Sequence, residues 1–195
     1  SIPLANPAFA GAIARRLQAH EADVSPALNA GATYFAELHV LSPDDAAAGH
    51  GVNNASYRQV NITGLAPNFN MSVTGTTQRG STAILAWAAA DPQVQVTTVN
   101  AADGVYVLAA RATDLGNGLW RYEYAVENIN SDRSVRLFSV PAANAVNVIN
   151  IGFHDVDYHS GDGNGNMNID GTDWPAIVSA SDIAWSTQDI ATNNN

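Results

Sequence analysis

The chain has 195 residues, of which 46% are hydrophobic and only 13% are charged. It is long enough for one domain with its own core and too poor in charge for a disordered chain. Its formal net charge is −10 and all eight basic residues are arginine, which disfavours nucleic acid and anionic membranes because phosphate binding needs a basic patch. The absence of Cys and Lys excludes disulfides, thiolate catalysis, cysteine-bound metals and Schiff-base chemistry.

No apolar run reaches the ~18 residues of a membrane span. The acidic composition, rich in Asn, Ser, Thr and Gly, is typical of secreted bacterial surface proteins. We therefore expect an extracellular or cell-surface protein whose stability comes from packing, metal binding or assembly rather than from disulfides.

Residues 1–31 are predicted to form an N-terminal segment that carries one short helix. Asn6 can cap this helix and Pro7 suits its first position. Its apolar face repeats every four residues, at Phe9, Ile13 and Leu17. We expect the helix to end around His20 to Glu21, before Pro26.

Residues 32–195 are predicted to form a single, mainly β domain. The apolar period changes to two, and Gly, Pro, Asn and Asp separate short segments without helices between them. This pattern indicates an antiparallel β-sandwich or jelly roll. The expected strands are 33–41, 56–63, 69–76, 82–88, 93–99, 104–112, 119–127, 134–140, 145–153 and 182–187, with a hairpin loop at 114–118.

Two of these segments alternate clearly between apolar and polar residues. Residues 69–74 place apolar Phe69, Met71 and Val73 against a wet face that includes Asn70, and residues 120–127 place an aromatic row against Arg121, Glu123 and Glu127. We expect the row Trp120, Tyr122, Tyr124 and Val126 to face the core. Segments 82–88, 105–108 and 146–151 are apolar on both faces, which favours a homo-oligomer or polymer in which a neighbouring subunit covers the outer faces.

Four segments resemble a family of uncharacterised secreted bacterial surface proteins. They are DDAAAGHGVNNASY at 44–57, LWRYEYAVEN at 119–128, NSDRS at 130–134 and GFHDVDYHSG at 152–161. The resemblance covers roughly residues 32–187 and implies an exported β-rich domain with no assigned activity. Relatives have a short loop where this chain has Asp162 to Asp170, and they continue past the Asn-rich end with another apolar strand.

Residues 162–173 have the spacing of a calcium-binding loop. Oxygen-bearing side chains occupy alternate positions of a twelve-residue turn, and Ca²⁺ prefers six to eight such ligands. The candidate ligands are Asp162, Asn164, Asn166, Asn168, Asp170 and Asp173. Met167 stands where the sharp turn prefers Gly, and Asp173 where a Glu is usual, so a polar turn that binds no ion is the alternative.

Asp155, Asp157 and His159 would share one face of a strand just before this loop. They can hold a transition metal, add ligands to the calcium loop, or form a solvated charge cluster.

Glu123 and Glu127 would share a face with Arg121, which permits a paired-carboxylate glycosidase but more often indicates a surface charge ladder. Because no nucleophile motif is present, we expect no enzymatic activity and solvent-facing glutamates.

Single residues predict one sugar-binding position and three candidate glycosylation sites. Trp174, beside the Asp-rich loop, is the predicted sugar-stacking platform, whereas Trp87 and Trp120 are expected in the core. Asn54, Asn61 and Asn70 begin N-x-[S/T] sequons and are candidate glycosylation sites.

The sequence therefore predicts a non-enzymatic extracellular structural protein that self-assembles into a filament or surface layer and is stabilised by calcium. A calcium-dependent carbohydrate-binding module is the alternative, and it requires Trp174 to be exposed beside a formed ion site. A glycan hydrolase is the second alternative, and it requires a carboxylate pair at the bottom of a cleft.

Overall fold

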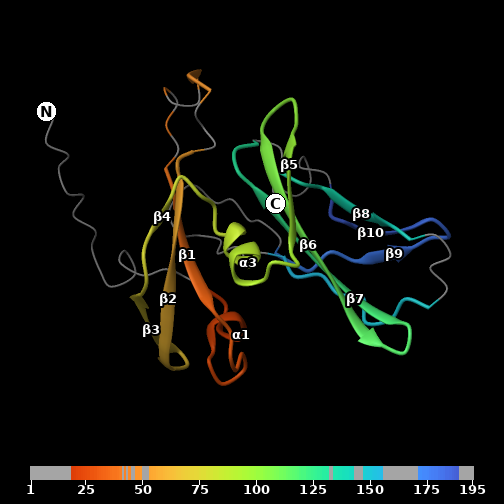
Figure 1. The fold of residues 1–195 in the computed structure, drawn as a ribbon, viewed down its shortest axis with the longest axis horizontal. Coiled ribbons are helices and arrows are strands. Elements are labelled where there is room, and N and C mark those ends of the chain that lie inside the picture. Colours follow the sequence, from red (N-terminus) through yellow and green to blue (C-terminus); the bar gives the residue numbers. More distant parts are fainter. Residues whose placement is uncertain are drawn as a thin grey trace, which may run out of the picture.

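The protein is mainly β and its strands pair antiparallel, as the sequence predicts (Figure 1). The computed structural model describes residues 19–40, 42, 44, 47–49, 53–131, 134–142, 147–155 and 171–188. In chain order the elements are α1 (Glu21–Val24), β1 (Tyr34–His39), β2 (Ala55–Leu65), β3 (Asn68–Val73), β4 (Gln78–Arg79), α3 (Leu85–Ala90), β5 (Gln95–Asn100), β6 (Val105–Gly116), β7 (Leu119–Asn128), β8 (Leu137–Pro141), β9 (Ala176–Val178) and β10 (Asp182–Ser186).

These strands form three sheets in a β-sandwich-like arrangement. The first has the order β1-β2-β3, with β4 also pairing with β2; the second has the order β5-β6-β7; and the third has the order β8-β10-β9. The short helix α3 lies between the first and second sheets and contacts β5 and β6 (Figure 1). The third sheet meets the opposite face of the second, where the rings of Tyr124 and Phe138 lie 5.5 Å apart.

The β6–β7 hairpin forms where the sequence predicts it. Asn117 and Gly118 both have positive φ, at 55° and 78°, which is the backbone that a two-residue Asn-Gly turn adopts. Gly116, at φ 80°, accommodates the register shift before the turn, and its N–H donates to Asp114 Oδ1 at 2.8 Å.

The strand predicted at 82–88 is wrong, because this region forms helix α3. Its sequence from Leu85 to Ala90 contains four alanines, a leucine and a tryptophan, and alanine and leucine favour a helix over a strand. The chain leaves the helix at Asp91, whose extended backbone fits the residue before a proline. This segment packs against β5 and β6 of the same chain, so its apolar residues give no support to assembly.

Differences also occur near the two ends of the described chain. Residues 1–18, which include most of the predicted helix, lie outside the described residues. The predicted helix was expected to end around His20, but His20 has an extended backbone and caps a separate helical turn, α1. The described part of the predicted strand 145–153 is irregular. The short strands β4 and β9 have no counterpart in the sequence prediction.

The face of β7 that the sequence predicts to be wet is partly buried. In the β6–β7 register Val107 lies opposite Glu127 and Ala109 opposite Ala125, so these four residues share one face of the sheet. Val107 and Ala109 are buried on this face. The aromatic row therefore lies on the other face, where only part of it is covered.

Among the described residues, a buried hydrophobic cluster lies at the third sheet. Trp174, Ile183 and Trp185 are buried there, and partly buried apolar side chains pack around them, including Phe138, Ile151 and Phe153. Among the described residues, no helix has the length and hydropathy needed to cross a membrane.

Candidate functional site

One face of β7 exposes four large apolar side chains, and we call it the β7 aromatic row. Its members Trp120, Tyr122, Tyr124 and Val126 are 51%, 60%, 38% and 38% exposed. They point to the same side because side chains two residues apart in a strand share a face. Tyr124 leans on Phe138 of β8, whereas Trp120 and Tyr122 are more exposed. The expectation that this row faces the core is wrong for its first two members.

The opposite face of the same strand is charged. Arg121 Nε lies 3.2 Å from Glu123 Oε2, and both side chains are substantially exposed. Such an exposed pair contributes little to stability by itself, about 0–1 kcal/mol. The Arg121–Glu123 pair places one positive and one negative charge two residues apart on an edge strand.

A carboxyl pair connects the first two sheets. Glu37 on β1 accepts the backbone N–H of Ala83, and Glu127 on β7 accepts the N–H of Ile84 at 3.2 Å. Both contacts are made at the start of α3, so one helix entry receives a carboxylate from each sheet. The sequence contained a signal for this site, because Glu37 is the only acidic residue in the mainly apolar and aromatic strand β1.

Burial, as the largest cause, and the negative charge of Glu37 together raise the pKa of Glu127 from 4.5 to about 7. The hydrogen bond from Ile84 N–H opposes this shift. The prediction that Glu123 and Glu127 both face solvent is therefore wrong for Glu127, which is half-buried. Glu127 pairs with Glu37 rather than with Glu123, so the glycosidase pair considered from the sequence does not form.

The predicted calcium loop mostly lies outside the described residues, which include only its last positions. Asp173 is described, and its Oδ1 accepts the backbone N–H of Asp155 at 3.0 Å. His154 Nδ1 lies 3.8 Å from the same oxygen. In the part of the chain that the structure describes, no three His, Asp or Glu side chains gather as a metal site. Asp162, Asn164, Asn166, Asn168 and Asp170 remain candidate calcium ligands on sequence grounds.

Trp174 is a core residue, and its assignment as an exposed sugar platform is wrong. It is 9% exposed, and its ring stacks on Phe153 with centroids 4.6 Å apart. Its indole N–H donates to Asp155 Oδ2 at 2.9 Å. Stacking on Phe153 occupies the aromatic face that a sugar would need, and the hydrogen bond occupies the indole's only donor.

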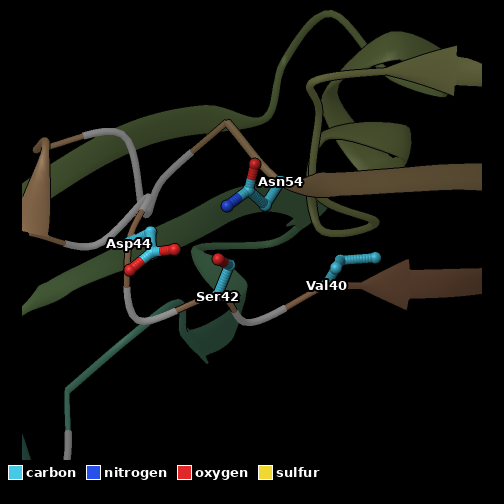
Figure 2. Close-up of a pocket in the computed structure, with 4 residues that line it drawn as sticks. All are labelled: Val40, Ser42, Asp44 and Asn54. Carbon is cyan, nitrogen blue, oxygen red and sulfur yellow. The ribbon is translucent and has the colours of Figure 1, made fainter. Parts of the chain in front are cut away.

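The three sequons differ in accessibility. Asn61 and Asn70 are exposed and lie on the same face of the β2–β3 hairpin, where Asn61 is opposite Ser72 and Asn70 is opposite Thr63. Asn54 is half-buried and lines a shallow hollow of about 470 Å³ with Val40, Ser42 and Asp44 (Figure 2). Exposure therefore favours Asn61 and Asn70 as acceptors over Asn54.

The chain was compared with protein-family models, curated proteins and solved structures, and none of the three comparisons returned a match.

Proposed function

We propose that this protein is a non-enzymatic, extracellular structural protein that assembles with copies of itself. The observation that carries this proposal is the distribution of its apolar side chains. In the described ranges, eighteen large hydrophobic residues are exposed, whereas eleven hydrophobic residues are buried and several of those are alanines. A monomer seldom leaves so much apolar surface in water, so a neighbouring subunit is the natural cover.

The sheet edges support the same proposal. Within the described residues, each of the three sheets is open and ends in edge strands whose outer backbone groups can pair with another chain. The second sheet ends in β7, which has ten residues and is long for an edge strand. An extracellular setting is supported by the composition and by the resemblance to secreted surface proteins, and calcium stabilisation by the spacing of residues 162–173.

The test is direct observation of assembly. Purified full-length protein should form particles larger than a monomer in sedimentation velocity at tens of micromolar concentration, and negative-stain microscopy should show filaments or sheets. The same measurements in calcium and in chelator separate assembly from calcium binding. A monodisperse monomer under both conditions would refute the proposal.

A carbohydrate-binding module is the second candidate, and the exposed pair Trp120 and Tyr122 favours it. Two aromatic side chains on one flat sheet face can stack against sugar rings. The net charge of −10 favours neutral over acidic glycans. A pull-down on insoluble neutral polysaccharides, with Trp120→Ala as the comparison, tests it; equal retention of both proteins rejects the stacking role.

A further inference from the structure

We propose that two copies of this chain join by antiparallel pairing of their β7 strands about a twofold axis at Tyr122. The inference rests on the proposed function and deepens it, because it names the surface and the partner. Three features of the described residues carry it: the outward backbone groups of β7, the order of its charges, and the exposure of its aromatic row.

The backbone of β7 offers unpaired ladder positions at the right residues. Ile129 N–H donates to the carbonyl of Val105, which sets the phase of the β6–β7 ladder. Because hydrogen-bonded pairs alternate along an antiparallel ladder, the odd-numbered residues of β7 face β6. The backbone N–H and C=O groups of Trp120, Tyr122 and Tyr124 therefore point to the edge of the sheet where β7 is the last strand that the structure describes.

Pairing centred on Tyr122 satisfies these groups in matched pairs. Tyr122 lies opposite Tyr122 of the second copy, and Trp120 lies opposite Tyr124 of the second copy on both sides of the axis. All of these residues have outward backbone groups, so each pair can exchange two hydrogen bonds. The result is a continuous six-stranded sheet, with three strands from each copy.

The charges on the other face select this register. With Tyr122 on the axis, Arg121 of each copy lies directly opposite Glu123 of the other, and these are non-hydrogen-bonded positions where side chains approach most closely. The next register in one direction places Arg121 against Arg121, and the next in the other direction places Glu123 against Glu123. Both neighbours are disfavoured by like-charge repulsion, so β7 is complementary to itself in one alignment.

The aromatic row gives the contact its apolar part. Trp120 and Tyr122, which are 51% and 60% exposed, would each gain an aromatic neighbour across the new strand pair. Aromatic cross-strand pairs are among the more stabilising pairs in sheets. The interface is isologous, since the same strand contributes from both subunits, and it closes as a dimer. Larger assembly then requires a second surface, such as an edge of another sheet.

Charge variants of the full chain test the alignment. Arg121→Glu places two glutamates opposite each other at both symmetry-related positions and should weaken dimerisation at least about tenfold. Combining it with Glu123→Arg restores opposite charges and should return the dissociation constant to within about threefold of the original value. Sedimentation velocity over a concentration series measures each constant.

A proline pair tests the edge without depending on charge. Tyr122→Pro removes an outward N–H and leaves the β6–β7 ladder intact, as edge strands tolerate. Thr98→Pro is the matched control at the opposite edge of the same sheet. Ala101 N–H donates to Gly104 O, which sets the β5–β6 phase so that Thr98 also points outward. The dimer should be lost only in the Tyr122 variant, while circular dichroism of both variants shows strand content like that of the original protein.

The outcomes separate this inference from the proposed function. Assembly that is equal in the original protein, Arg121→Glu and Tyr122→Pro overturns β7 pairing and leaves self-assembly standing. A dimer that responds as described but never grows further supports the pairing and refutes the filament or surface layer. A protein that is monomeric at all concentrations overturns both.

Discussion

Replacing Glu127 by glutamine is expected to stabilise the protein at and above neutral pH and to leave its stability unchanged in acid. Glu127 is half-buried between the first two sheets, beside Glu37 and the start of α3. Burial and the charge of Glu37 raise its pKa from 4.5 to about 7. Glutamine keeps an oxygen to accept the Ile84 N–H and adds an amide that can donate to Glu37.

The sign follows from proton binding. Between pH 4.5 and about 7 the folded protein holds a proton that the unfolded chain has lost, so the free energy of unfolding falls as pH rises through this window. A shift of this size corresponds to about 3.4 kcal/mol for a fully buried group. Since the carboxyl is only half-buried, solvent screening reduces the expected penalty above pH 7 to about 1–2 kcal/mol.

Urea denaturation of the original protein and Glu127→Gln at several pH values measures this penalty. The difference in the free energy of unfolding should be near zero at pH 4.5 and should grow to about 1–2 kcal/mol at pH 8. Glu37→Gln removes the negative charge that helps to raise the pKa of Glu127, so it should reduce the pH dependence of stability in the same direction. Glu123→Gln, on the same face of the same strand but ion-paired at the surface, is the control and should leave the pH profile unchanged. A difference that is constant from acid to alkaline pH would refute the shared burial of the two carboxyls.

Three other predictions test the core, the calcium loop and the absence of catalysis. Ile183→Ala should lower the free energy of unfolding by about 2–4 kcal/mol, whereas Ile177→Ala on the neighbouring strand, 63% exposed, should change it by less than about 0.5 kcal/mol; equal effects would contradict the burial pattern. Millimolar calcium should raise the melting temperature relative to chelator, and Asp162→Ala should abolish that rise; an unchanged midpoint in both proteins would rule out the calcium loop. Reducing-sugar release from a panel of neutral glycans should stay at background, because the β7 glutamates do not pair with each other across a cleft.

Short-range sequence patterns were sufficient to predict many of the strands along the chain. Alternation in 69–73 and 119–127, and the Asn117-Gly118 turn with its positive φ angles, are properties of a few adjacent residues, and the structure contains the strands and the hairpin they predict. The helix at 85–90 was missed because an uncharged apolar run has no visible period. The alanine content of this segment favours a helix, but its hydrophobicity alone does not distinguish a helix from a buried strand.

The candidate sites depended more heavily on tertiary contacts. Glu37 and Glu127 are 90 positions apart, and only the docking of α3 between two sheets brings their carboxyls to neighbouring N–H groups. Trp174 seemed accessible because polar residues surround it in sequence, yet Phe153, reached through folding, covers its ring. In both cases the deciding neighbour is distant along the chain, where periodicity carries no information.

By itself the sequence determined the class of the protein: antiparallel β, acidic, free of cysteine and lysine, and with strands whose two faces differ in polarity. Only the tertiary structure decided which face of each strand is covered. The aromatic side of β7 was expected inside. On the partner strand β6, however, Val107 and Ala109 are buried on the other face, and the register places Glu127 opposite Val107 on that face. Alternate residues of a strand share a face, so the register with β6 sets the faces of all β7 residues together. The burial of the β6 residues therefore decides which face of β7 is covered, and it leaves Trp120 and Tyr122 at the surface.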